Sequence, residues 1–182
     1  MRSWTMAIIL ATLAAPLPAP AGGETSAGPE VELKAAVVFS FARFADWPEA
    51  ENVTTPPVTI GVLGTEEFYR VLQDAVFGKT IQGRRVLIRQ LKTASDAPGC
   101  QIVFVGLGGA KLREVLPRLR ESRILTIGDD RGFLNSGGAV RLSELDGRIV
   151  FDFDADAVAQ SGVPVNARLL RLGKAHKKRG TP

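Results

Sequence analysis

The sequence predicts a single-domain α/β sandwich, in which helices flank a mostly parallel β-sheet and one antiparallel hairpin lies at its edge. Short runs of apolar and β-branched residues alternate along the chain with longer segments whose apolar residues recur at helical spacing. Strands that alternate with helices favour parallel pairing. Two segments of alternating polarity, joined by a Leu-Asp-Gly turn at residues 145–147, predict the hairpin.

Residues 31–48, with the sequence VELKAAVVFSFARFADWP, are predicted to form the first helix, and the rest of the domain is organised around it. Because its apolar stripe is broad, we expect this helix to be mostly covered. Pro48 lacks an N–H group and ends the helix. The stripe consists of Leu33, Val37, Phe41 and Phe44, and it is widened by Ala36, Val38 and Phe39.

The remaining elements follow in order along the chain. The predicted strands comprise residues 58–63, 85–91, 102–105 and 124–127, followed by the hairpin strands 139–143 and 148–153. A helix capped by Thr65 is expected to bury Phe68, Leu72 and Val76, and a second helix opens at residues 106–109 and runs to about residue 121. The last helix is expected to begin at Asp154 or Asp156, to break at Gly162 and Pro164, and to continue over residues 165–175.

Composition places the chain among soluble globular proteins. Its 182 residues suffice for one domain with a sizeable core, and 45% of them are hydrophobic and 23% charged. These values exclude disordered and collagen-like classes. The net charge of +4 is modest, and Lys and Arg are scattered along the chain until the C-terminus, so nucleic-acid binding is not expected.

The N-terminus has the features of a secretory signal peptide. Arg2 is followed by the apolar run MAIILATLAA and then by small residues that include Ala19 and Ala21. The apolar run is too short to cross a bilayer as a helix, which takes about 20 residues. We therefore predict a signal peptide over residues 1–21, a flexible leader over 22–30, the folded domain over 31–175 and a basic tail over 176–182. The protein is expected in the periplasm.

Residues able to perform catalysis or to bind a metal are few. Cys100 and His176 are the only cysteine and histidine, so an intramolecular disulfide is impossible and a zinc site lacks ligands. Cys100 is expected to be a buried small hydrophobe, with a functional thiol as the alternative. His176 is expected at a solvated helix end. No cofactor and no metal are expected.

Two further patterns in the sequence bear on chemistry. The run Gly106-Leu107-Gly108-Gly109 resembles part of a dinucleotide fingerprint, but Lys111 stands where the third glycine belongs, so a tight turn is favoured. Carboxylate clusters that could hold a hard cation occur at positions 129–130 and at 152, 154 and 156. Each cluster lies at a strand end or a helix start, which favours capping and turn formation. The sequence does not indicate an enzyme.

Seven segments of the chain together resemble the YfiR-like family of periplasmic proteins. They include KAAVVFSFARFADWP, VTIGVLG, GKTIQGRRVLIRQL, CQIVFVG, ILTIGDDRGFLNSGGAVRL, RIVFDFDADAV and SGVPVNARLLRLGK. The resemblance implies a non-enzymatic exported regulator that binds the periplasmic sensor domain of an inner-membrane diguanylate cyclase and represses it. It also implies a homodimer.

This chain departs from the family at two points. Disulfide-bonded members link redox state to activity, and the lone Cys100 does not allow that switch within one chain. The family helix often has Asn where Ser40 stands, so a contact made by that amide would be lost here.

Two surfaces are candidates for binding the partner. The first is formed by Arg43, Phe44 and Trp47 at the end of the first helix, because Trp and Arg often carry interface energy. The second is formed by Leu169, Leu170 and Arg171 near the C-terminus. One alternative is a periplasmic domain that senses a small ligand and acts on a histidine kinase. Another is an enzyme with an unrecognised carboxylate or serine site.

Overall fold

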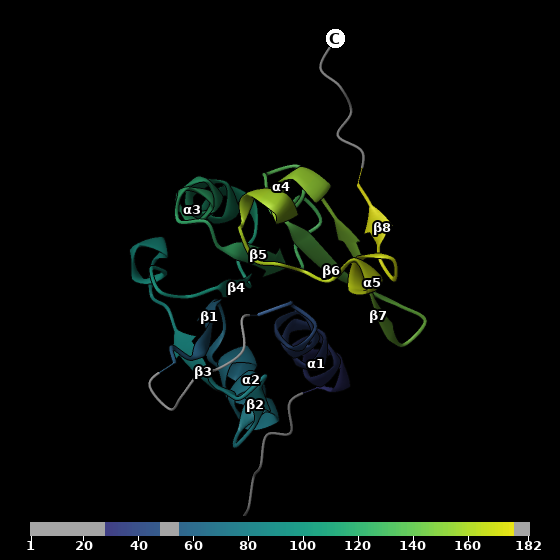
Figure 1. Ribbon diagram of the computed structural model, residues 1–182. Coiled ribbons are helices and arrows are strands. Elements are labelled where there is room, and N and C mark those ends of the chain that lie inside the picture. The colour runs from purple at the N-terminus through teal and green to yellow at the C-terminus, as the bar shows by residue number, and fades with distance from the viewer. Residues whose placement is uncertain (1–27, 48–54, 177–182) are drawn as a thin grey trace, which may run out of the picture.

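The computed structural model describes residues 28–47 and 55–176, and it consists of one eight-stranded sheet flanked by helices (Figure 1). The strands are β1 (Val58–Leu63), β2 (Thr80–Ile81), β3 (Arg84–Gln90), β4 (Ile102–Val105), β5 (Leu125–Gly128), β6 (Val140–Leu145), β7 (Arg148–Phe153) and β8 (Lys174–Ala175). The helices are α1 (Pro29–Arg43), α2 (Glu66–Val76), α3 (Gly109–Glu121), α4 (Ala155–Gln160) and α5 (Ala167–Leu170), with a 3₁₀ turn, η1, at Ala94–Asp96.

The strand order is β2-β3-β1-β4-β5-β6-β7-β8. The central strands from β3 to β6 pair in parallel, and β6 and β7 form the antiparallel hairpin. This arrangement confirms the predicted fold class. The short strand β8 pairs in parallel outside the hairpin, and β2 adds a second antiparallel pair at the opposite edge. Sequence patterns did not predict either edge strand as a separate element.

The sheet separates two clusters of buried side chains. In β4, Ile102 and Phe104 belong to the cluster that contains α1 and α2, whereas Val103 and Val105 belong to the cluster that contains α3. Alternate residues of one strand thus face opposite layers, and every residue of β1, β4 and β5 is buried. This explains why these strands are continuous apolar runs.

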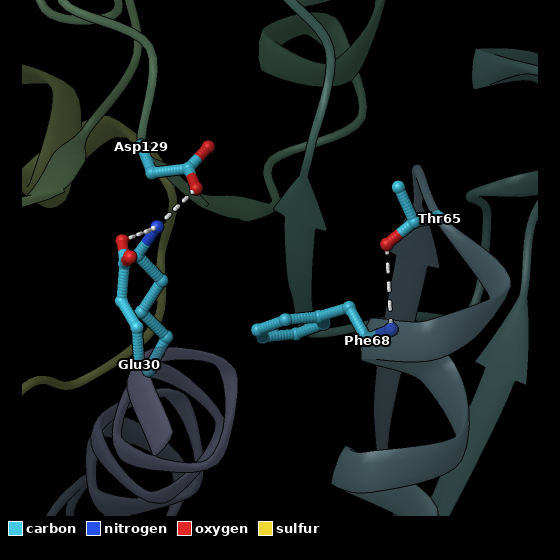
Figure 2. Close-up of polar contacts among 5 residues, drawn as sticks. Glu30, Thr65, Phe68 and Asp129 are labelled. Atoms are coloured by element: carbon cyan, nitrogen blue, oxygen red, sulfur yellow. Dashed lines mark hydrogen bonds and ion pairs between the residues drawn. The ribbon is translucent and has the colours of Figure 1, made fainter. Parts of the chain in front are cut away.

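The start of α2 agrees with the sequence prediction. The Thr65 hydroxyl accepts a hydrogen bond from the backbone N–H of Phe68 at 3.3 Å (Figure 2). The ring of Phe68 then stacks on that of Phe104 in β4, with 3.7 Å between ring centroids. A local cap and a core contact therefore hold the same turn of α2.

The first helix differs from its prediction in length and in the side that it buries. It ends at Arg43, so Trp47 lies beyond it. Leu33 and Phe44, two members of the predicted stripe, are 43% and 45% exposed. The buried side consists of Ala35, Val38, Phe39, Phe41 and Ala42. Because apolar residues surround this helix on all sides, spacing alone could not identify the side facing the sheet.

The prediction of a helix over residues 165–175 was wrong. Only Ala167–Leu170 is helical, and Lys174–Ala175 forms β8 along β7. The chain can pass close to the sheet because Gly173 has no side chain: a Cβ there would lie 2.1 Å from the Phe151 ring. His176 therefore extends the β7–β8 pairing, with its N–H 2.7 Å from the Phe153 carbonyl oxygen, and is not at a helix end.

The predicted signal peptide and most of the leader and basic tail lie outside the described residues. The leader prediction was wrong at its end, because α1 already begins at Pro29. Within the part that the structure describes, no helix is both long enough and apolar enough to cross a membrane.

Candidate partner-binding site

Two segments far apart in the sequence meet beside the end of α1. Ala45 and Val165 form an isolated antiparallel β-bridge. The N–H of Asp46 donates to the carbonyl of Pro164 at 2.8 Å, and the N–H of Asn166 donates to the carbonyl of Phe44 at 3.2 Å. The backbone thus fixes the end of α1 against the start of α5, and the two predicted surfaces become neighbours.

Asn166 strengthens this junction through its side chain. Its amide nitrogen lies 3.2 Å from Oδ1 of Asp46, and its amide oxygen accepts a hydrogen bond from the N–H of Arg168 at 2.8 Å. The second contact caps α5. One side chain therefore both starts the short helix and ties it to the segment that follows α1.

A small cavity of about 230 Å³ lies at the junction, lined by Phe44, Asn166, Arg168, Leu169 and Leu172. Leu169 is only 8% exposed, whereas Phe44 and Leu172 are 45% and 79% exposed. The cavity and these two exposed side chains form a concave apolar surface, which we call the α1–α5 groove. A groove of this kind can receive an apolar side chain of a partner.

Two arginines lie at the α1–α5 groove. The Arg43 guanidinium lies 4.8 Å from the centre of the Phe44 ring. Arg168 lines the cavity and is exposed, as is Arg171. Arginine binds carboxylates through a fork of N–H donors and also stacks on aromatic rings. The groove is thus suited to a segment that combines acidic and apolar side chains.

The predicted partner-binding residues differ in their access to solvent. Arg43, Phe44 and Arg171 are exposed, and Phe44 lines the groove. Trp47 is partly buried, and its indole N–H donates to the carbonyl of Ala42 at 2.7 Å. Leu169 is buried and is available only as a cavity wall, and Leu170 packs against the core. Sequence reasoning missed Asn166, Arg168 and Leu172, because their place beside Phe44 depends on pairing across the fold.

The acidic residues considered for metal binding have structural contacts instead. Asp129 lies 2.7 Å from the Lys34 amine, which also contacts Glu30 at 2.7 Å (Figure 2). Burial opposes the charge of Lys34, but the contacts with Asp129 and Glu30 outweigh it and raise the lysine pKa. Asp130 accepts a hydrogen bond from the N–H of Gly132 at 2.7 Å. Among the described residues, no group of three potential ligands is placed to hold a metal ion.

In the second carboxylate cluster, at positions 152, 154 and 156, Asp152 and Asp154 contact different partners. Asp152 pairs with Arg141, and Asp154 accepts a hydrogen bond from the N–H of Ala157 at 3.0 Å as the cap of α4. Asp152 also lines a second cavity of about 400 Å³, together with Lys174, Ala175 and His176. The His176 ring nitrogen Nε2 lies 3.2 Å from the side-chain oxygen of Asn135. This cavity lies at the β8 edge of the sheet and carries three polar side chains in its lining.

The glycine-rich segment after β4 forms a close backbone turn. A Cβ on Gly64 would lie 3.0 Å from Cα of Gly106, so the turns after β1 and β4 touch. A Cβ on Gly108 would lie 2.6 Å from a carboxylate oxygen of Asp130. That negative group stands beside the start of α3, where a bound phosphate would lie, so the tight-turn interpretation is favoured.

Cys100 is buried, as predicted. Its sulfur lies 3.0 Å from Nη2 of Arg89, which also donates to the carbonyls of Asp96 and Pro98. Burial raises the pKa of the thiol, although the charge of Arg89 opposes this effect. The thiol therefore stays protonated near neutral pH and is a poor nucleophile.

Comparison with known proteins gave one family and several similar solved structures, one of which is described here. A family model described as YfiR/HmsC-like matches residues 31–174. The crystal structure of a conserved domain protein from Vibrio cholerae O1 biovar El Tor is similar, with a TM-score of 0.53 and 9% sequence identity. The match covers 81% of this chain and 60% of that chain, and at this identity it concerns the fold alone. A search of curated proteins found no match.

Proposed function

The chain belongs to the YfiR/HmsC-like family, and from this premise we propose that it is an exported repressor of an inner-membrane diguanylate cyclase. The family consists of periplasmic regulatory proteins that act in cyclic di-GMP signalling, and it is not a known enzyme family. In this proposal the protein binds the periplasmic sensor domain of the cyclase and keeps the cytoplasmic catalytic domain inactive. The signal peptide over residues 1–21 is removed on export.

The α1–α5 groove is the observation that carries this proposal. A repressor needs no catalytic group, only a surface that binds one state of its partner more tightly than the other. The groove offers an exposed aromatic ring, an apolar cavity lined in part by Arg168, and the Arg43 guanidinium over the Phe44 ring. Such residues account for much of the binding energy in known interfaces. The resemblance also implies a homodimer, and this stays a prediction.

The β8-edge cavity supports a second candidate function, a small-ligand sensor that acts on a histidine kinase. Its volume of about 400 Å³ suits a small molecule, and Lys174 and His176 offer hydrogen-bond donors. A ligand that binds there would raise the melting temperature of the purified protein. Screening carboxylate and zwitterionic metabolites by thermal shift, with Lys174→Met as the control variant, tests this candidate.

The repressor proposal is tested by crosslinking the tagged mature protein in membranes and identifying what is captured. Cyclic di-GMP is measured in parallel in a deletion strain. We expect capture of a membrane diguanylate cyclase and a rise in cyclic di-GMP on deletion. Arg43→Ala and Arg171→Ala should each reduce capture several-fold. Arg113→Ala, an exposed arginine of α3, is the matched control and should leave capture unchanged.

Other outcomes separate the alternatives. Capture of a histidine kinase with unchanged cyclic di-GMP would support the sensor function and reject the cyclase. If folded Arg43→Ala and Trp47→Ala variants capture the cyclase as well as the wild type does, the α1–α5 groove is not the binding surface.

A further inference from the structure

Strand β3 lies near one edge of the sheet and is covered along only part of its outer side. β2 has two residues and pairs only with Arg84 and Arg85. On its inner side, β3 pairs in parallel with β1 from Val86 to Gln90. Among the described residues, no strand pairs with the outer side of residues 86–90. We call this stretch the β3 free edge.

The outward backbone groups of the β3 free edge are unpaired. Leu91, directly after β3, donates its N–H to the carbonyl of Val62 in β1 at 2.8 Å, so its backbone groups face β1. Successive residues of a strand direct their N–H and C=O groups to opposite sides, so Leu87 and Arg89 face β1 as well. The residues that face outward are Val86, Ile88 and Gln90. In the part of the chain that the structure describes, their outward groups have no backbone partner, so an added strand can pair with them.

The two faces of the β3 free edge differ in polarity. Val86 and Ile88 are partly buried and pack against the cluster that contains α1 and α2. On the opposite face, Leu87 is 45% exposed and belongs to neither core cluster. Arg85 and Arg89, two residues away on either side of it, are exposed. An added strand would therefore meet apolar side chains on one face and an Arg-Leu-Arg row on the other.

The charge around the β3 free edge favours an acidic strand. Residues 75–95 contain five basic side chains and no acidic one, a larger positive charge than the +4 of the whole chain. Within the described residues, Arg85 and Arg89 have no carboxylate partner. Arg89 is held in place by the carbonyls of Asp96 and Pro98, at 2.8 and 2.7 Å. A guanidinium group without a carboxylate partner binds acidic side chains well.

A second copy of this chain is a poor cover for the β3 free edge. Two β3 strands that pair antiparallel about a twofold axis would place Arg85 and Arg89 of both copies on one face of the joined sheet. Like charges on neighbouring strands destabilise the pairing. The two arginines thus oppose self-association at this edge and favour an acidic strand in its place.

We propose that the β3 free edge binds an extended acidic segment of a partner protein, which adds to the sheet as a further strand. Acidic side chains of that segment lie opposite Arg85 and Arg89, and an apolar side chain between them lies opposite Leu87. On the other face, apolar side chains of the segment extend the cover of Val86 and Ile88. This interaction is separate from cyclase repression and holds whichever protein supplies the segment.

Fluorescence anisotropy of a labelled synthetic peptide tests the proposal with the purified mature chain. The peptide core is Glu-Val-Leu-Val-Glu, whose pattern is the same in both chain directions and therefore fits a parallel or an antiparallel strand. The control peptide, Val-Glu-Leu-Glu-Val, has the same composition, but its acids are two residues apart, whereas Arg85 and Arg89 are four apart. Because its two acids cannot face both arginines, we expect it to bind about fivefold more weakly.

Substitutions distinguish strand addition from charge attraction alone. Arg85→Glu should weaken binding of the first peptide about tenfold, whereas Arg148→Glu, at an exposed arginine of β7, should not. Ile88→Pro removes an outward N–H and leaves the pairing with β1 in place, so it should weaken binding far more than its matched control, Ile88→Ala. Arg43→Ala should have no effect, because Arg43 lies at the α1–α5 groove. Circular dichroism verifies that each variant is folded.

Amide hydrogen exchange, followed by NMR, locates the added strand. On binding of the first peptide, exchange should slow at Val86 and Ile88, whose N–H groups face outward. It should stay unchanged at Leu87 and Arg89, which already pair with β1. Equal affinity for the two peptides, unchanged binding in Ile88→Pro, or no added protection at Val86 and Ile88 would each overturn the proposal. None of these results bears on cyclase capture.

Discussion

The amine of Lys34 lies 2.7 Å from carboxylate oxygens of both Glu30 and Asp129, although the lysine side chain is only 13% exposed. Glu30 belongs to the same helix, but Asp129 follows β5. The contact therefore ties α1 to the sheet through one partly buried charge. The charged form of Lys34 is stabilised by these two carboxylates, because removing them would leave a partly buried charge without compensation.

Replacing Lys34 with Met is expected to lower the free energy of unfolding by about 1–2 kcal/mol at pH 7. The expected loss is small because Asp129 is 32% exposed and solvent screens the ion pair. The folded state raises the Lys34 pKa, so its contribution is present below the unfolded-state pKa of about 10.4 and is lost as pH rises through the folded-state pKa. Urea titrations at pH 7 and pH 11 measure both effects.

Lys111→Met is the matched control for this prediction, because Lys111 is an exposed lysine of α3. It should change the free energy of unfolding by less than about 0.5 kcal/mol at either pH. A difference between wild type and Lys34→Met that does not shrink at pH 11 would mean that the charge of Lys34 does not stabilise α1.

At the scale of elements, α4 depends on one buried cap. Asp154 is 3% exposed, and its Oδ1 accepts the N–H of Ala157 at 3.0 Å. Helix α4 has only six residues and needs this contact to begin. Asp154→Ala should therefore lower the free energy of unfolding by about 1–2 kcal/mol. Chemical denaturation measures the loss, and Asp156→Ala, an exposed acid in the same turn, should cause a clearly smaller change.

Elements with local signals could be predicted from the sequence. Residues 58–63 and 102–105 are apolar runs that match β1 and β4, and Thr65 marks the start of α2. The end of the helix at Leu170 and the strand β8 after it could not be predicted, because the apolar residues of segment 165–175 also occur at helical spacing. Lys174–Ala175 is a strand and not a helix because it pairs with β7, which is a contact between distant parts of the chain.

The candidate site was only partly visible in the sequence for the same reason. Arg43, Phe44 and Arg171 could be chosen by residue type, because exposed arginines and aromatic residues near element ends are common binding residues. Their meeting at one groove depends on the Ala45–Val165 bridge and on the contact between Asp46 and Asn166. Residue spacing does not predict contacts between positions 120 residues apart.

At the scale of the whole molecule, one sheet carries both layers of the core. Trp47 packs against the cluster that contains α1, and Cys100 belongs to the cluster that contains α3. The same strands supply side chains to both clusters. Since neither cluster retains its covering if the sheet comes apart, we expect the domain to unfold in a single cooperative step.

Two probes, one for each layer, make this expectation measurable. The mature chain retains Trp47 as its single tryptophan, because Trp4 lies in the predicted signal peptide. Trp47 fluorescence and Cys100 alkylation should therefore give the same urea midpoint. Ile124→Val removes one methylene from the α3 layer, which should cost about 0.5–1.5 kcal/mol and move both midpoints equally. A fall in the Cys100 midpoint alone would mean that the α3 layer opens independently, and the domain would then have two folding units on one sheet.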